Sequence, residues 1–154
     1  MKLVSLLSAA ALLASATVAS ANSFDTYVVN FTHNEAAESS VLDNAINAAL
    51  AQAGVNAESV TIDMSTAAKW EASAHVAFDR DIVPVFNKWV GLPGFAAIVD
   101  ARSKRVVGCV NSKFTADEIA QEVRRHTLMA AGRAVKTDAS TFQKTTQCPP
   151  AHNK

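Results

Sequence analysis

His33 lies close in the sequence to Glu35, Glu38 and Ser39, and this group contains the residue types of a reactive site. A histidine, an acid and a hydroxyl can serve as general base, orienting group and nucleophile, so the group raises a hydrolase hypothesis. No nucleophile-elbow motif accompanies it, and residues so close in sequence do not fix their mutual geometry. We therefore assign no catalytic residue here.

Glu71 and His75 form a second candidate site, because they stand one helical turn apart. Side chains at this spacing share one side of a helix and could share a metal ion. A zinc site needs further ligands, and the sequence identifies no third one. We expect no metal or other cofactor. A periplasmic metal-binding protein that uses His33, His75 and nearby carboxylates stays an alternative.

Cys109 and Cys148 are the two cysteines of the chain. An even number of cysteines in an exported protein favours a disulfide. Closing a loop of about 40 residues would stabilise the fold by about 4 kcal/mol in the chain-entropy model. Cys109 stands between Gly108 and Val110 in a predicted strand, which favours a buried, structural sulfur. Unpaired thiols and a redox-active pair are the alternatives.

Export is predicted from residues 1–21, which have the pattern of a signal peptide. Lys2 supplies the positive start, residues 3–13 the apolar core, and residues 19–21 a small-residue cleavage site. The apolar core is short for a bilayer of ~30 Å. Removing Lys2 leaves one more acidic than basic residue, so nothing favours nucleic acid or anionic lipid. We expect a periplasmic or secreted protein without a membrane span after signal removal.

The remaining elements alternate between strands and helices and end in a polar tail. Apolar and β-branched runs predict strands at residues 24–32, 59–64, 95–99 and 105–110, the last two forming a hairpin. Helical periodicity predicts helices from about residue 35 to 53, at 66–78, after Asp81, and from Thr115 to Gly132. We divide the chain into a signal peptide (1–21), one domain (22–132) and an extended tail (133–154).

Two of the predicted helix starts carry the same capping signature. Thr32 and Glu35 fit a capping box, with Asn34 as an alternative cap, and Thr115 and Glu118 fit a second box. Glycine is preferred just after a helix, where a left-handed backbone costs least, so Gly54 and Gly132 are expected at helix ends. Trp70 and Trp89 are expected to be core or half-buried anchors.

The element order, together with GLPGFAAIVDARSKRVVGCVNSKFTADEIAQEVRR at residues 91–125, resembles the thioredoxin family. The resemblance implies an α/β thioredoxin-like fold, with a central mixed sheet of about four strands flanked by helices. It also implies that Pro93 is the family's cis-proline and that the helix around Trp70 is an insertion. Ala36, Ala37, Glu38 and Ser39 fall where the family carries its Cys-x-x-Cys, so dithiol chemistry at that place is absent.

We therefore expect an exported, non-catalytic binding protein of thioredoxin-like fold. The family's substrate groove would lie at His33, Asn34, Glu35 and Ser39 together with Leu92, Pro93 and Gly94. A partner polypeptide, another envelope or secreted protein, could add backbone hydrogen bonds there. The alternative enzyme is a thiol-disulfide redox protein that uses Cys109 and Cys148.

Overall fold

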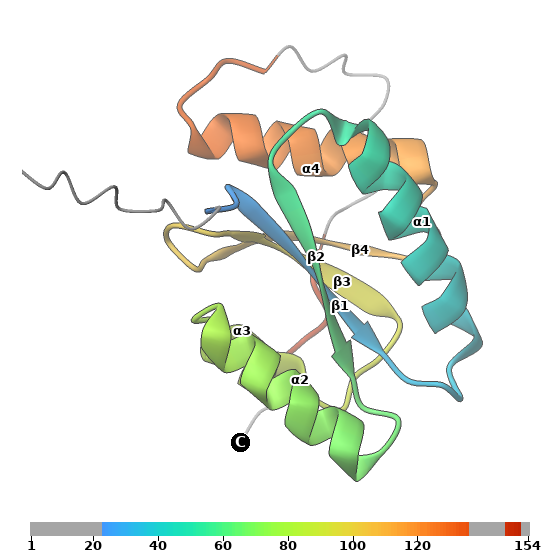
Figure 1. The fold of residues 1–154 in the computed structure, drawn as a ribbon. Helices are drawn as coiled ribbons and strands as arrows, with labels where there is room; N and C mark the ends of the chain where they lie inside the picture. The colour runs from blue at the N-terminus through green and yellow to red at the C-terminus, as the bar shows by residue number, and fades with distance from the viewer. Residues whose placement is uncertain (1–22, 136–146, 152–154) are drawn as a thin grey trace, which may run out of the picture.

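The computed structural model describes residues 23–135 and 147–151. They form a four-stranded sheet flanked by helices (Figure 1). The strands are β1 (Thr26–Thr32), β2 (Ala57–Asp63), β3 (Phe95–Asp100) and β4 (Val106–Asn111). The helices are α1 (Ala37–Ala53), α2 (Ala67–Asp79), α3 (Val83–Trp89) and α4 (Ala116–Ala130). The predicted signal peptide, residues 1–21, lies outside the described residues.

The sheet has the order β2-β1-β3-β4 and mixed polarity. β1 and β2 run parallel, whereas β3 is antiparallel to both β1 and β4. α1 makes the crossover between the parallel strands, and β3 and β4 form the predicted hairpin. This confirms the expected α/β architecture, a mixed four-stranded sheet flanked by helices, which is compatible with a thioredoxin-like fold.

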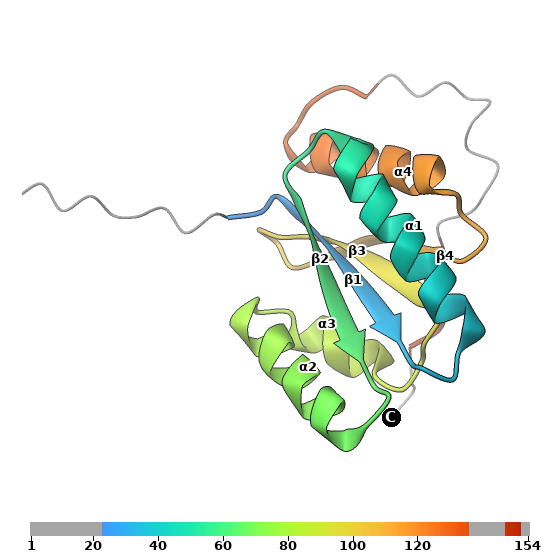
Figure 2. The same ribbon diagram turned by 45° about the vertical axis from the view of Figure 1, so that its right-hand side comes forward.

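Helices cover both faces of the sheet, α1 and α4 on one and α2 and α3 on the other (Figures 1 and 2). Side chains of β1 alternate between the two cores: Val28 packs with α1 and α4, whereas Val29 and Phe31 face α2 and α3. Phe31 stacks on Phe95 with ring centroids 5.0 Å apart, and Trp89 meets both rings edge-on. β1 and β3 are thus buried on both faces, and the continuous apolar run of β3 is typical of such a strand.

The helix ends confirm some of the predicted signals and correct others. Gly54 follows α1 with a φ of 63°, and Thr115 and Glu118 form the predicted capping box of α4. α2 is capped by Thr66, whose side chain accepts the N–H of Lys69. α3 begins after Ile82. The capping box expected at the start of α1 is absent, and Ala36 occupies the N-cap position instead.

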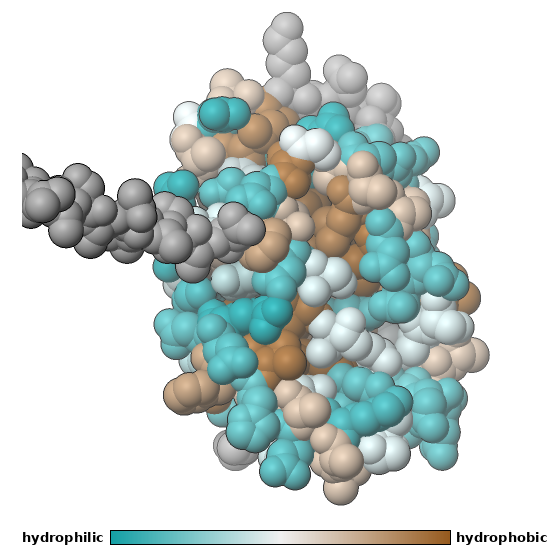
Figure 3. All heavy atoms as spheres, viewed as in Figure 1, coloured by the Kyte–Doolittle hydropathy of each residue, from teal (hydrophilic) through white to brown (hydrophobic). Residues whose placement is uncertain are grey.

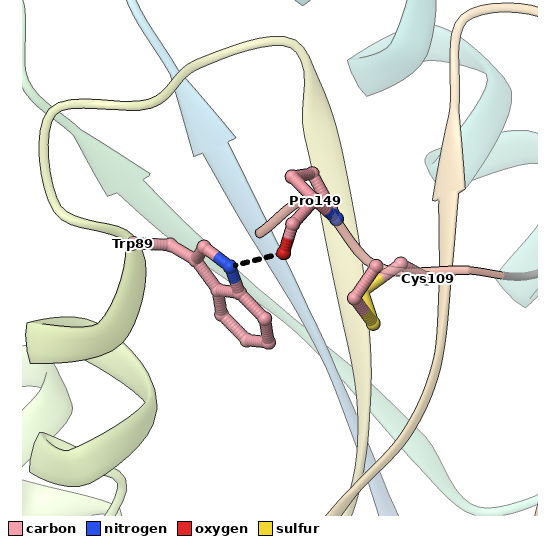
Figure 4. The surroundings of a disulfide bond; sticks show 4 residues. Trp89, Cys109 and Pro149 are labelled. Carbon is pink, nitrogen blue, oxygen red and sulfur yellow. Dashed lines mark hydrogen bonds between the residues drawn. A yellow bond between two sulfur atoms is a disulfide. The ribbon is translucent and has the colours of Figure 1, made fainter. Parts of the chain in front are cut away.

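A disulfide between Cys109 and Cys148 joins the end of the chain to β4, as predicted (Figure 4). Cys109 is 3% exposed, and Cys148 packs against the core beneath α2 and α3. The indole Nε1–H of Trp89 donates to the carbonyl of Pro149 at 3.0 Å. Residues 147–151 are therefore held on the α2–α3 side by one covalent and one polar contact. Among the described residues, no helix combines the length and apolarity of a membrane span.

A polar crevice at the ends of the parallel strands

A crevice of about 360 Å³ opens where the parallel strands β1 and β2 end. The chain leaves β1 into α1 on one face of the sheet and leaves β2 into α2 on the other, as Figures 1 and 2 both show. Such a divergence leaves a hollow beyond the strand ends, which is the usual place for ligands in open α/β sheets. Its lining comprises Thr32, His33, Asn34, Ala36, Ala37, Ser39, Ser40, Asp43, Thr61, Asp63, Ser65 and Lys69.

The start of α1 forms one wall of the crevice and has no cap from a described side chain. Ala36 occupies the N-cap position with extended backbone angles (φ −89°, ψ 107°). Glu35 stands before this N-cap, outside the helix, so it cannot be the third helical residue whose side chain completes a capping box; its backbone N–H donates to His33 Nδ1 at 3.2 Å. The capping box predicted from Thr32 and Glu35 is therefore wrong. Without a side-chain acceptor, the first-turn amides give this wall a partial positive charge.

The loop from His33 to Ser39 is nevertheless held in place by hydrogen bonds. The backbone N–H of His33 donates to Ser39 Oγ at 3.2 Å, and Ser39 itself is 6% exposed. The N–H of Asn34 donates to Ser65 Oγ at 2.9 Å, which ties the loop after β1 to the loop after β2. The two loops that frame the crevice are thus linked directly.

An ion pair closes the side of the crevice that borders α2. Lys69 Nζ lies 2.8 Å from Asp63 Oδ2, and the backbone N–H of Ser65 donates to Asp63 Oδ1 at 2.9 Å. Burial alone would raise the pKa of Asp63, but hydrogen bonds from Lys69 and Ser65 and the charge of Lys69 lower it to about 2. Both charges of this pair are therefore satisfied within the wall.

Asn30 and Asp43 are polar residues of this region that the sequence reasoning missed. Asn30 is 0% exposed in the central strand β1, and its Nδ2 donates to Asp43 Oδ1 at 3.3 Å. The Asn30 Oδ1 atom has no hydrogen-bond partner among the described residues. An unsatisfied buried polar atom costs about 1–3 kcal/mol, so this residue needs an explanation beyond packing. The available signal was an asparagine inside the apolar run YVVNF.

The second predicted part of the groove, Leu92 to Gly94, lies at the same end of the sheet but does not line the crevice. The N–H of Gly94 donates to the carbonyl of Phe31 at 2.9 Å, and Leu92 packs against the core of the α2–α3 side. The peptide bond before Pro93 is trans, so the predicted cis-proline is wrong. Gly91 and Gly94, with φ of 90° and 93°, reverse the chain around a proline in its ordinary isomer.

The other candidate chemistry lies elsewhere or is not assembled. Cys109 and Cys148 are bonded to each other and belong to the α2–α3 core, not to the crevice lining. Across residues 23–135 and 147–151, no group of three or more histidine, cysteine or acidic side chains could hold a metal ion. His75 is therefore not brought together with His33 in such a group.

The crevice combines hydroxyl groups, one satisfied ion pair and the carboxylate of Asp43. Ser39 Oγ accepts the backbone N–H of His33, and the described contacts include no hydrogen bond between this hydroxyl and the imidazole ring. The geometry therefore resembles a binding site more than a nucleophile with its base. Comparison with known proteins finds no matching family model, curated protein or solved structure.

Proposed function

We propose that this protein is an exported, non-catalytic binding protein that engages an extended segment of another envelope or secreted protein in the polar crevice. The observation that carries the proposal is the position of the crevice where β1 and β2 end and their connections diverge. Its polar lining suits a hydrated, hydrogen-bonding ligand better than an apolar one. The face drawn in Figure 3 carries many hydrophilic side chains, with hydrophobic patches among them.

A polypeptide is the favoured ligand because β2 is an edge strand beside the crevice. The N–H of Met64 donates to β1 at Thr32, whereas the N–H of Asp63 donates to Ser73 Oγ on the outer side. Backbone groups alternate in direction along a strand, so those of Ser59 and Thr61 also face outward. An extended segment along this edge can pair with them and place side chains in the crevice.

The alternative functions draw less support from the same geometry. A redox enzyme that uses Cys109 and Cys148 needs a sulfur that a thiolate can reach, and here Cys109 is 3% exposed and Cys148 is half-buried against the core. A metal-binding role would need ligands that the described residues do not assemble. An insulin-reduction assay tests the redox alternative directly, and we expect no turnover above that of a variant lacking both cysteines.

Site-directed photo-crosslinking in the native cell envelope tests the proposed binding site. A photoreactive phenylalanine analogue replaces Ser40, which lines the crevice, or Val107, on β4 at the opposite edge of the sheet. We expect a discrete protein adduct from position 40 and none from position 107. Adding Thr61→Arg, which fills the crevice from β2, should remove the adduct without changing the melting temperature by more than a few degrees. Equal adducts at both positions, or none at position 40, would contradict the proposal.

A further inference from the structure

We infer that the crevice selects a basic side chain of the bound segment, with Asp43 as the recognising carboxylate and Asn30 as the residue that positions it. This inference rests on the proposed function, because it specifies which polypeptide segment the crevice accepts. It assigns a role to a buried asparagine and to a carboxylate for which the packing of the fold offers none.

The charge distribution in the crevice singles out Asp43. Asp63 and Lys69 neutralise each other at 2.8 Å. Asp43 is half-buried, lines the crevice and has no ion-pair partner among the described residues. Its one described hydrogen bond comes from the neutral amide of Asn30. A carboxylate in this position attracts a cation more strongly than one in open solvent, because partial burial reduces screening.

Asn30 gives that carboxylate a fixed place. Its side chain is fully buried on the α1 side of β1, and its Nδ2 reaches Asp43 Oδ1 at 3.3 Å. An apolar residue here would avoid the cost of the unpartnered Oδ1 atom. Asn30 therefore lowers the stability of the fold but supplies an amide donor to Asp43. This donor is neutral, so it leaves the negative charge of Asp43 intact, whereas a lysine or arginine at this position would neutralise that charge.

The positive end of α1 does not oppose a cation at Asp43. The effect of a helix terminus is confined to about one turn, and Asp43 stands six residues into α1, about 9 Å along the axis from Ala37. Ala36, Ser40 and Asp43 follow one another at helical spacing along the same wall. The crevice thus has its electropositive part at the helix start and its electronegative part farther along α1.

An arginine-containing peptide and its neutral analogue provide the test. The probes are acetyl-Gly-Arg-Gly-amide, the citrulline peptide of the same shape, and the glutamate peptide, each titrated into the disulfide-intact mature protein. Amide chemical shifts of Ala37, Ser40, Asp43 and Thr61 report occupancy of the crevice. We expect the arginine peptide to bind about three- to tenfold more tightly than the citrulline peptide, and the glutamate peptide to bind most weakly.

Asp43→Asn should reduce the arginine preference to within twofold, and the matched charge change Glu71→Gln, on exposed α2 surface, should leave it intact. Asn30→Ser should weaken the preference, and the Asp43 variant decides the question if the Asn30 variant fails to fold. Equal binding of all three peptides would overturn the selectivity and leave the proposed function standing. No shift with any peptide would overturn both. If methylguanidinium binds as tightly as the arginine peptide, the ligand of the crevice is a small cation and not a polypeptide, which would overturn the proposed partner.

Discussion

The starts of α1 and α4 carry the same sequence signature and have opposite structures. At α4, Thr115 Oγ1 accepts the N–H of Glu118, and the N–H of Thr115 donates to Glu118 Oε2 at 2.7 Å. At α1, the equivalent threonine and glutamate make no such pair, and Ala36 occupies the N-cap. The capped start belongs to a helix outside the crevice, whereas the uncapped start of α1 forms a wall of the crevice.

The difference shows that the preceding strand determines whether a capping box can form. Thr32 is the last residue of β1 and pairs with Asp63 of β2, so it cannot also be the first residue of a helix. Thr115 follows a turn after β4 and is free to adopt the cap conformation. Natural proteins tend to break local rules at functional places, which agrees with the uncapped start being part of the proposed site.

Removing the disulfide should give the largest effect and shows whether the two helix starts are independent of the tail. Replacing Cys109 and Cys148 together by alanine should lower the free energy of unfolding by up to about 4 kcal/mol, because the unfolded chain loses a long closed loop. Urea unfolding measures this loss. Amide shifts at the start of α1 should stay unchanged in the folded variant. Changed shifts there would mean that the contact of residues 147–151 influences the structure of the crevice, so that the start of α1 depends on more than its own sequence.

Thr115→Ala removes the side-chain cap of α4 and should cost about 1 kcal/mol, because the first-turn amide of Glu118 loses its side-chain acceptor. Thr32→Ala, at the motif that does not form, provides the control and should not change hydrogen exchange at the first turn of α1. Thermal and urea unfolding give the energies. Equal loss of first-turn protection at both helices would show that α1 is capped in solution after all.

Asp63→Asn tests the ion pair that faces the start of α1. The pKa of Asp63 is lowered from 3.8 to about 2, so the pair stabilises the fold above pH 4, and this contribution is lost as the pH falls toward 2. Lys69 is 54% exposed, and solvent screening leaves about 1 kcal/mol or less. Unfolding free energies measured from pH 2 to pH 5 should rise less steeply in the variant. An unchanged slope would indicate that the pair is fully screened.

Ala36→Ser should give the smallest effect, a stabilisation of about 0.5 kcal/mol, because serine at the N-cap supplies the missing acceptor. Glu35→Ala is the companion variant and should change stability by less, since this side chain does not cap the helix. Urea unfolding measures both. If the serine also weakens the crosslink from position 40, the open amides of α1 take part in binding. A loss of stability would contradict the assignment of Ala36 as N-cap.

Much of the fold is predictable from the sequence because its signals are local. The apolar runs that form β1 and β3, the capping box at Thr115 and the glycine after α1 each depend on neighbours in the chain. The disulfide is predictable from the even number of cysteines in a chain with a predicted signal peptide. The family resemblance, rather than a local signal, predicts His33 and Ser39 as groove residues, and both line the crevice.

The rest of the site depends on contacts between distant segments. In the sequence Asp43 looks like an ordinary surface residue of a helix, and only the fold places Asn30 against it. Lys69 lines the crevice only because α2 begins beside the end of β1. The cis isomer expected at Pro93 is implied only by the family resemblance, and the bond is trans. The two flanking glycines, which turn the chain without a cis bond, offered the contrary local clue.

The contact between Trp89 and residues 147–151 should make tryptophan fluorescence sensitive to the position of this segment. Trp89 is 0% exposed with its indole N–H bonded to Pro149, whereas Trp70 is 46% exposed on α2. Iodide in solution should therefore quench the emission of Trp70 and leave that of Trp89. The protected emission should shift to longer wavelength once the tail leaves its place, so fluorescence alone can follow the detachment of residues 147–151 while the domain stays folded.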